Sequence, residues 1–235
     1  MQFSGIHTLT LLDYPDRVAA IVFTPGCNMR CHFCHNSEFV LPEELKKIQH
    51  DFIPEEKVLH FLETRKGFLD GLVISGGEPT IFGEALISFL QKVRVLGFLI
   101  KLDTNGTHPE VLEKIFHKKL VDYVAMDIKA SPERYNEITG VANDFSAITK
   151  SKDLILASGV EYEFRTTVIH GFHNASELDC IGRFIQGAKK YTLQNYRNGK
   201  VLDPEWKKFM GFSTTELKMM EMQMRAFAEK VVVME

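Results

Sequence analysis

Residues 24–36, TPGCNMRCHFCHN, decide how the rest of this sequence is interpreted. The stretch holds Cys27, Cys31 and Cys34 in the spacing C-x3-C-x2-C. Thiolates are soft ligands that suit iron–sulfur clusters or zinc, and cysteines this close in one loop can converge on one metal centre. Three ligands leave one iron of a four-iron cluster without a protein ligand, and an open metal position is where a cofactor or substrate binds. The spacing therefore indicates a reactive metal centre.

The spacing alone leaves structural zinc open as an alternative. A closed zinc site needs a fourth ligand, for which His32, His35 and Cys180 are available. Phe33, just before the third cysteine, has two interpretations. Its ring could shield a cluster from water or pack beside an adenine ring.

Composition limits the kind of protein. With 235 residues, 45% of them hydrophobic, we expect one domain over residues 1–235. The net charge of −3 gives no general attraction to a polyanion, so nucleic acid is not expected as a partner. No apolar run is long enough to span a bilayer and the N-terminus lacks a secretory pattern, so we expect no membrane contact. Clustered cysteines are typical of a metal site in a reducing compartment, which predicts a cytoplasmic location.

Outward from the cysteine loop, β-like apolar runs alternate with helix-like stretches. About six such units predict an α/β fold, a partial (β/α)6 TIM-like barrel around a parallel sheet. The expected strands are 18–23, 72–75, 100–103, 123–127, 161–168 and 191–194, and the expected helices are 54–64, 84–96, 109–118, 145–157 and 176–187.

The C-terminal part, residues 195–235, is expected to pack at the barrel rim. Residues 195–212 are rich in Gly, Pro and charge and predict an exposed loop. Ser213 predicts the cap of a helix over 214–229, and an apolar run, 231–233, follows.

Polar motifs follow three of the expected strands: SGGEPT at 75–80, DTNG at 103–106 and MDIK at 126–129. Each alone could be an ordinary turn or cap. Together with the cysteine loop they fall at the carboxyl ends of consecutive parallel strands, the face where such barrels build their sites. The candidate binding residues are Gly76, Gly77, Glu78, Asp103, Thr104, Asn105, Asp127 and Lys129.

The cysteine triplet, with an aromatic residue before the third cysteine, resembles the signature of the radical S-adenosylmethionine (radical SAM) superfamily. Residues 5–36 resemble the start of the activating proteins of anaerobic ribonucleoside-triphosphate reductase, which are glycyl-radical enzyme activating enzymes. The resemblance implies a barrel of the radical SAM type with a [4Fe-4S] cluster on Cys27, Cys31 and Cys34 in the loop 24–36. It also implies S-adenosylmethionine as cofactor, cleaved reductively to a 5′-deoxyadenosyl radical that abstracts hydrogen from a target.

By the same resemblance, Gly76, Gly77 and Glu78 would bind the amino group of S-adenosylmethionine. Asp103, Thr104 and Asp127 would arrange its carboxylate, with or without a monovalent cation near Asp103, and Lys129 would neutralise it. The remaining cofactor contacts implied are Phe33, Asn105, Arg165, Gln194 and, near the end of the same strand, Tyr196. Arg165 could equally pair with a carboxylate as a structural contact.

The implied partners are the large subunit of anaerobic ribonucleotide reductase, which would receive a glycyl radical, and an electron donor of the flavodoxin or ferredoxin type. Three other functions stay open: an activating enzyme of the pyruvate formate-lyase type, a small-molecule enzyme similar to 7-carboxy-7-deazaguanine synthase, and a non-catalytic iron–sulfur or zinc sensing module. No second group of cysteines is present for an auxiliary cluster.

Overall fold

The computed structural model describes all 235 residues, and its framework is one eight-stranded sheet in the order β10-β9-β8-β7-β6-β5-β3-β2. Seven strands run parallel, and β2 pairs antiparallel with β3 at one edge. The edge strands β2 and β10 do not pair, so the barrel is open. The strands are β2 (Gly5–Thr10), β3 (Ala19–Thr24), β5 (Gly71–Gly76), β6 (Leu99–Thr104), β7 (Tyr123–Asp127), β8 (Glu161–Val168), β9 (Ala188–Asn195) and β10 (Ala228–Met234), with a small separate pair, β1 (Gln2–Phe3) and β4 (Ile53–Pro54).

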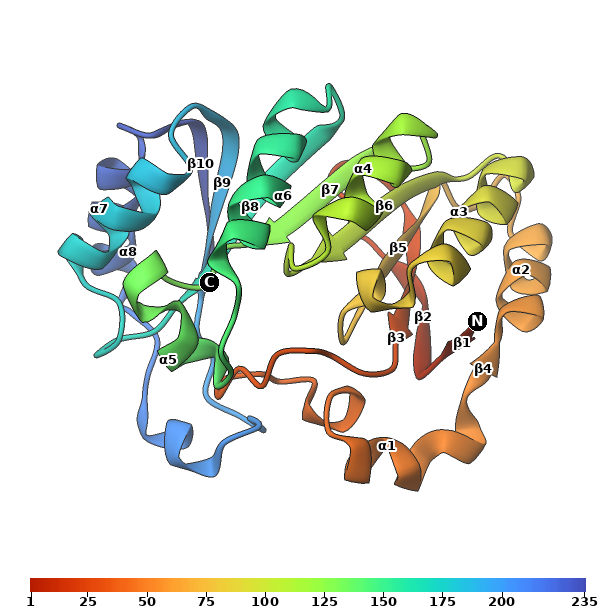
Figure 1. Cartoon of the computed structure of the whole chain (residues 1–235), viewed down its shortest axis with the longest axis horizontal. Helices are drawn as coiled ribbons and strands as arrows, with labels where there is room; N and C mark the ends of the chain where they lie inside the picture. Colours follow the sequence, from red (N-terminus) through yellow and green to blue (C-terminus); the bar gives the residue numbers. More distant parts are fainter.

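Helices follow the parallel strands and cover the outer face of the curved sheet (Figure 1). The α-helices are α1 (Pro42–Ile48), α2 (Glu55–Thr64), α3 (Glu84–Leu96), α4 (Pro109–His117), α5 (Tyr135–Thr139), α6 (Phe145–Ala157), α7 (Ala175–Phe184) and α8 (Thr214–Met224). Short 3₁₀ helices lie at Ser37–Phe39, Gln49–Asp51, Pro79–Phe82, Pro132–Arg134 and Pro204–Lys208. None of these helices is long and apolar enough to cross a membrane.

Local sequence explains where two of these helices stop and start. Gly97 ends α3 in the left-handed conformation, with φ of 90°, which costs a residue without a Cβ little. Ser213 begins α8 with a reciprocal capping box, because its hydroxyl accepts from the Glu216 N–H while the Glu216 carboxylate accepts from the Ser213 N–H. The capped start of α8 agrees with the sequence prediction.

The two faces of the sheet differ in chemistry. The outer face packs the main apolar core against the helices. The inner face carries charged side chains as well, because residues two apart on a strand point the same way. Lys101 is 1% exposed there, and Lys190 Nζ lies 3.1 Å from a Glu163 carboxylate oxygen. A charged inner face therefore leads toward the carboxyl ends of the strands.

The structure departs from the sequence predictions at the C-terminus. Helix α8 ends at Met224, five residues before the predicted end, because the chain turns at Arg225–Phe227 and continues as β10. β10 pairs in parallel with β9. The apolar run 231–233 thus supplies a seventh parallel strand, one more than the six predicted units. Helix α1 and the edge strand β2 were not expected from the sequence.

His173 joins two of the loops at the carboxyl ends of the strands. Its Nδ1 accepts from the Ile169 N–H at 3.0 Å, and its Nε2–H donates to the Lys129 carbonyl at 3.1 Å. Burial lowers the pKa of His173 to about 4. The ring is therefore neutral in the folded protein at neutral pH and fixes the backbone of Lys129.

His173 should make stability depend on pH below neutrality. In the unfolded chain the imidazole takes up a proton near pH 6.5, whereas the folded chain resists protonation down to about pH 4, so lowering the pH favours unfolding. Between about pH 7.5 and pH 5 we expect this group to remove about 2 kcal/mol from the free energy of unfolding. Urea unfolding at the two pH values measures the loss, and His173→Gln should lack that part of it. An equal loss in both proteins would contradict the assignment.

Candidate functional site

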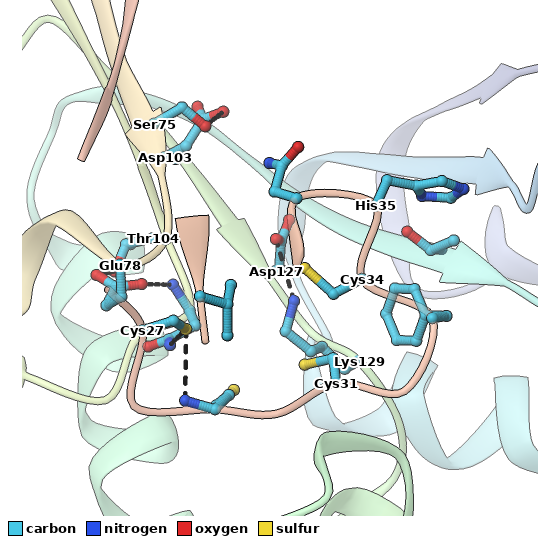
Figure 2. Close-up of a pocket in the computed structure, with 18 of the residues that line it drawn as sticks. Cys27, Cys31, Cys34, His35, Ser75, Glu78, Asp103, Thr104, Asp127 and Lys129 are labelled. Atoms are coloured by element: carbon cyan, nitrogen blue, oxygen red, sulfur yellow. Dashed lines mark hydrogen bonds and ion pairs between the residues drawn. The ribbon is translucent and has the colours of Figure 1, made fainter. Parts of the chain in front are cut away.

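The cysteine loop and the ends of β5 to β8 surround one cavity of about 230 Å³. Figure 2 shows Cys27 beside Glu78 and Thr104, and Cys31 and Cys34 beside Lys129. The residues that line the cavity are Cys27, Met29, Cys31, Phe33, Cys34, His35, Asn36, Val40, Ser75, Gly76, Gly77, Glu78, Asp103, Thr104, Asn105, Asp127, Lys129, Arg165 and Thr167.

All three cysteines of the loop are free and line the cavity. Burial raises the pKa of Cys27 to about 11 and that of Cys31 to about 12, while the Lys129 ammonium acts in the opposite direction on both and on Cys34. Thiols of this kind stay protonated until a metal replaces the proton.

No group of three or more His, Cys, Asp or Glu side chains converges tightly enough to hold a single metal ion. A four-iron cube binds each thiolate at a different corner, so its ligands need only face a common cavity. A closed zinc site needs four donors around one atom. Of the candidate fourth ligands only His35 lines the cavity, and it does not converge with the three cysteines on one ion position. The donor set therefore fits an iron–sulfur cluster better than structural zinc.

Two glycines let the cysteine loop approach the end of β5. A Cβ on Gly77 would lie 1.8 Å from the carbonyl oxygen of Gly26, and a Cβ on Gly76 would lie 2.3 Å from the backbone nitrogen of Thr24. Gly76 also has φ of 114°. Without these Cβ atoms the two backbones are close enough to hydrogen-bond. Gly77 N–H donates to the Thr24 carbonyl, and Glu78 N–H donates to the Gly26 carbonyl. The missing side chains of Gly76 and Gly77 therefore make room for the cysteine loop itself.

Glu78 is 1% exposed and joins the end of β5 to the end of β6. Its carboxylate accepts from the Thr80 N–H at 3.0 Å and from the Thr80 hydroxyl, from the Thr104 hydroxyl at 2.8 Å and from the Asn105 N–H at 2.6 Å. Burial raises the pKa of Glu78, and these hydrogen bonds act to lower it. Donors on both oxygens are the partners of an ionised carboxylate, and they leave little of Glu78 open to a ligand.

A charged network occupies the inner wall. Arg165 donates from Nε to Asp127 at 2.9 Å and from Nη1 to Asp103 at 3.2 Å. Lys129 Nζ lies 3.3 Å from Asp127, and Lys101 pairs with Asp103. Although burial acts to raise it, Arg165 and Lys129 hold the pKa of Asp127 at about 2. Arg165, Lys129 and Lys101 against Asp103 and Asp127 give this wall a net positive charge, which Glu78 offsets elsewhere in the cavity, so an anionic group is favoured at this wall.

The structure brings together all but two of the predicted site residues, Gln194 and Tyr196. Gln194 does not line the cavity: it lies on β9 next to Thr167, one strand farther from the cysteine loop. Tyr196, the other adenosine candidate, is also outside and donates its hydroxyl hydrogen to the Trp206 carbonyl at 3.2 Å. For Arg165 both predicted interpretations apply, since it faces the cavity and pairs with carboxylates.

Three polar residues on the strands of this region were not predicted as site residues. Ser75 and Thr167 line the cavity, and the Ser75 hydroxyl donates to Asp103 at 3.3 Å. Lys101 lies behind the cavity and neutralises Asp103. A signal for Lys101 was present, because a lysine inside an apolar strand two residues before Asp103 must share its face.

Comparisons of the sequence with a family model and with individual relatives point to the same family. A model of the Radical SAM superfamily matches residues 21–181. A Methanocaldococcus jannaschii protein, provisionally named a glycyl-radical enzyme activating enzyme, is 33% identical over 234 residues, covering 98% of this chain and 94% of that protein. The pyruvate formate-lyase-activating enzyme of Listeria monocytogenes is 29% identical over 216 residues, covering 82% of this chain and 86% of that enzyme.

A solved structure supports the fold alone. Streptococcus suis SuiB bound to its precursor peptide SuiA superposes with a TM-score of 0.67 at 13% identity, over 92% of this chain and 48% of that chain.

The contact between Gly77 and Gly26 generates a testable prediction. Gly77→Ala should push the cysteine loop off the end of β5, because the added methyl meets backbone rather than a movable side chain. We expect a large loss of iron and sulfide bound after anaerobic reconstitution, measured per chain. Gly5→Ala is the matched control, since a Cβ there meets only the Phe23 and Phe39 rings, at ordinary distances of 3.6 and 3.9 Å. Full iron binding by Gly77→Ala would refute this account of the loop.

Proposed function

The chain belongs to the radical SAM superfamily, and from that premise we propose that it generates a glycyl radical on the large subunit of anaerobic ribonucleoside-triphosphate reductase. That it is an enzyme of the activating kind rests on relatives that match nearly its whole length. The observation that carries the site assignment is the single cavity shared by Cys27, Cys31, Cys34 and the strand-end motifs.

We propose that the three cysteines hold a [4Fe-4S] cluster with one iron open to S-adenosylmethionine. When bound, this pair supplies reductive cleavage of the cofactor to a 5′-deoxyadenosyl radical that takes hydrogen from the target. The protein's own residues orient the reactants and exclude water. Phe33, 7% exposed, shields the cysteine loop, and the Lys129 ammonium lies 5.8 Å from the centre of its ring.

The charges around the cavity support a binding mode for the amino-acid part of S-adenosylmethionine. Its carboxylate would lie against the net positive charge of the inner wall, with Lys129 as the neutralising group and with Asp103 and Asp127 framing that end. Thr104, predicted for the same end, donates its hydroxyl hydrogen to Glu78 at 2.8 Å and so would lie nearer the amino group. Burial alone would lower the pKa of Lys129. The attraction of Asp127 and of the cysteine sulfurs outweighs burial and raises that pKa, so the ammonium stays charged. A monovalent cation near Asp103 is not needed, because Lys101 and Arg165 already face that carboxylate.

The amino group of S-adenosylmethionine would lie at the opposite end, against Gly76, Gly77 and Glu78. Since the Glu78 oxygens are already bonded by Thr80, Thr104 and Asn105, Glu78 would act there mainly through its charge and by fixing the turn. Adenosine contacts by Gln194 have less support, because that residue is outside the cavity.

Two glycyl-radical enzymes are candidate partners of this protein. The resemblance of residues 5–36 to reductase-activating proteins supports the reductase subunit, and the Listeria relative supports an activating enzyme of the pyruvate formate-lyase type as the second candidate. The relatives that cover most of the chain carry activating-enzyme names, which disfavours a small-molecule enzyme or a sensing module. The electron donor proposed is a one-electron flavodoxin or ferredoxin.

A reconstituted reaction tests the function. The protein with its cluster, S-adenosylmethionine and a low-potential reductant should release 5′-deoxyadenosine. With the reductase large subunit added, a glycyl signal should appear in electron paramagnetic resonance spectra. Cys31→Ala should abolish both, because the cluster loses a ligand. Cys180→Ala should leave both intact, because Cys180 lies on α7 outside the cavity.

Three results would count against the proposal. Absence of 5′-deoxyadenosine would remove the radical chemistry. A glycyl signal on pyruvate formate-lyase but not on the reductase would change the partner. Loss of the cluster with Cys180→Ala but not with Cys31→Ala would change the ligands.

Lys129 gives a separate prediction about cofactor binding. Lys129→Met should retain the cluster but bind S-adenosylmethionine roughly tenfold more weakly, because a cation facing a buried carboxylate is lost while Arg165 still pairs with Asp127. Equilibrium dialysis with radiolabelled cofactor measures the affinity. Unchanged affinity would remove Lys129 from the site, and Lys152→Met is the control, because that lysine lies on α6 over the Phe184 ring.

A further inference from the structure

The loop that follows β9, residues 196–212, lies along the cysteine loop. Figure 1 shows it, in blue, beyond the carboxyl ends of the strands, where the red-orange cysteine loop also runs. The two loops are joined through their backbones. Leu202 N–H donates to the Cys34 carbonyl and Asp203 N–H to the His32 carbonyl, each at 3.0 Å. The 196–212 loop is therefore hydrogen-bonded to the segment that carries the second and third cysteines.

Side chains reinforce this contact around His32. Its Nδ1 lies 3.0 Å from a carboxylate oxygen of Asp203. Its ring stacks on Trp206, with centroids 5.1 Å apart and an angle of 13° between the planes. Trp206 also meets the Phe33 ring at 6.5 Å and the Phe172 ring at 5.7 Å. Asp203 and Trp206 of the 196–212 loop thus hold the side chain of His32, the residue next to Cys31 in the sequence.

The opposite side of the same segment is held by the end of α5. Arg30 N–H donates to the Thr139 carbonyl at 2.8 Å, and His32 N–H donates to the Ile138 carbonyl at 3.3 Å. His32 therefore has its N–H bonded to one element and its carbonyl bonded to another. Residues 30–34 are fixed between α5 and the 196–212 loop.

The first cysteine is held independently. Asn105 donates to the Asn28 side chain at 2.9 Å, and the Gly26–Gly77 contact fixes the loop on its other side. Nothing in the 196–212 loop takes part in these contacts. The cysteine loop thus has two halves with separate contacts to the rest of the fold, one around Cys27 and one running from Cys31 to Cys34. Within the loop they are joined by Arg30, which donates from Nη1 to the Cys27 carbonyl at 2.6 Å.

We infer that His32, Asp203 and Trp206 form a clasp that positions Cys31 and Cys34 for the cluster and slows loss of iron from that half of the loop. The inference rests on the proposed function, since it requires a cluster at the three cysteines. None of the three clasp residues lines the cavity, so they act through the backbone of the cysteine loop. The role of the 196–212 loop in the enzyme would then be to hold residues 30–34, which carry Cys31 and Cys34.

The rate of iron release to a chelator tests the clasp in the reconstituted full-length protein, under anaerobic conditions. Trp206→Ala should release iron roughly tenfold faster than wild type, because an aromatic stacking partner is lost. Trp206→Phe keeps a ring against His32 and should stay within roughly twofold of wild type. Lys207→Ala is the matched control in the same loop, since the Lys207 side chain is exposed and its backbone carbonyl keeps the bond from Asn198.

A spectroscopic signature separates positioning from general stability. The electron paramagnetic resonance spectrum of the reduced cluster should change in Trp206→Ala, while Trp206→Phe should retain the wild-type spectrum. Asp203→Ala, a smaller change, should give intermediate iron release and serves as the main variant if Trp206→Ala fails to fold. Wild-type release rates and spectra in Asp203→Ala and in any folded Trp206→Ala would overturn the clasp while leaving the proposed function intact. A wild-type protein that binds no cluster would overturn both.

Discussion

The backbone contact between Gly26 and Gly77 is the constraint on which the rest of the site depends. It brings the loop after β3 directly onto the turn after β5, at a distance that no side chain could occupy. Glu78, next to Gly77, then ties that turn to the end of β6 through Thr104 and Asn105. A metal-binding loop is in this way built onto three adjacent strand ends without any need for long connecting segments. The geometry comes from the absence of two Cβ atoms and the presence of one buried carboxylate.

The inner face of the sheet adds the electrostatic part. Asp127 and Arg165 stand side by side in the register of β7 and β8, and Asp103 faces Arg165 from β6. Buried ion pairs are costly unless each charge is well bonded, and here each carboxylate has two cationic partners. The arrangement keeps charges fixed in place before any ligand arrives. Charges fixed in advance form a preorganised environment that needs no rearrangement when a ligand binds.

Much of the fold was predictable because strands and helices here have strong hydrophobic periods. The helix 84–96 and the strand 161–168 were predicted with the bounds they have, and the strand-end motifs identified most of the cavity. The end of α8 was not predictable in the same way, because pairing with β9, a tertiary effect, turns residues 228–234 into a strand. Gln194 failed as a cavity residue for a similar reason. Its position on a strand was predicted, but which strands face the cysteine loop depends on the curvature of the whole sheet. The position of Lys101 on the same face as Asp103 could have been predicted from strand alternation.

The edges β2 and β10 do not pair, so no row of backbone hydrogen bonds between them fixes the width of the barrel. In a closed barrel, widening the interior would break a full row of backbone hydrogen bonds between two strands. Here the edges can separate by flexing the sheet, with every existing strand pair kept. With the proposed function, a loop of the partner protein would therefore have a route between these two edges as well as a route from the rim.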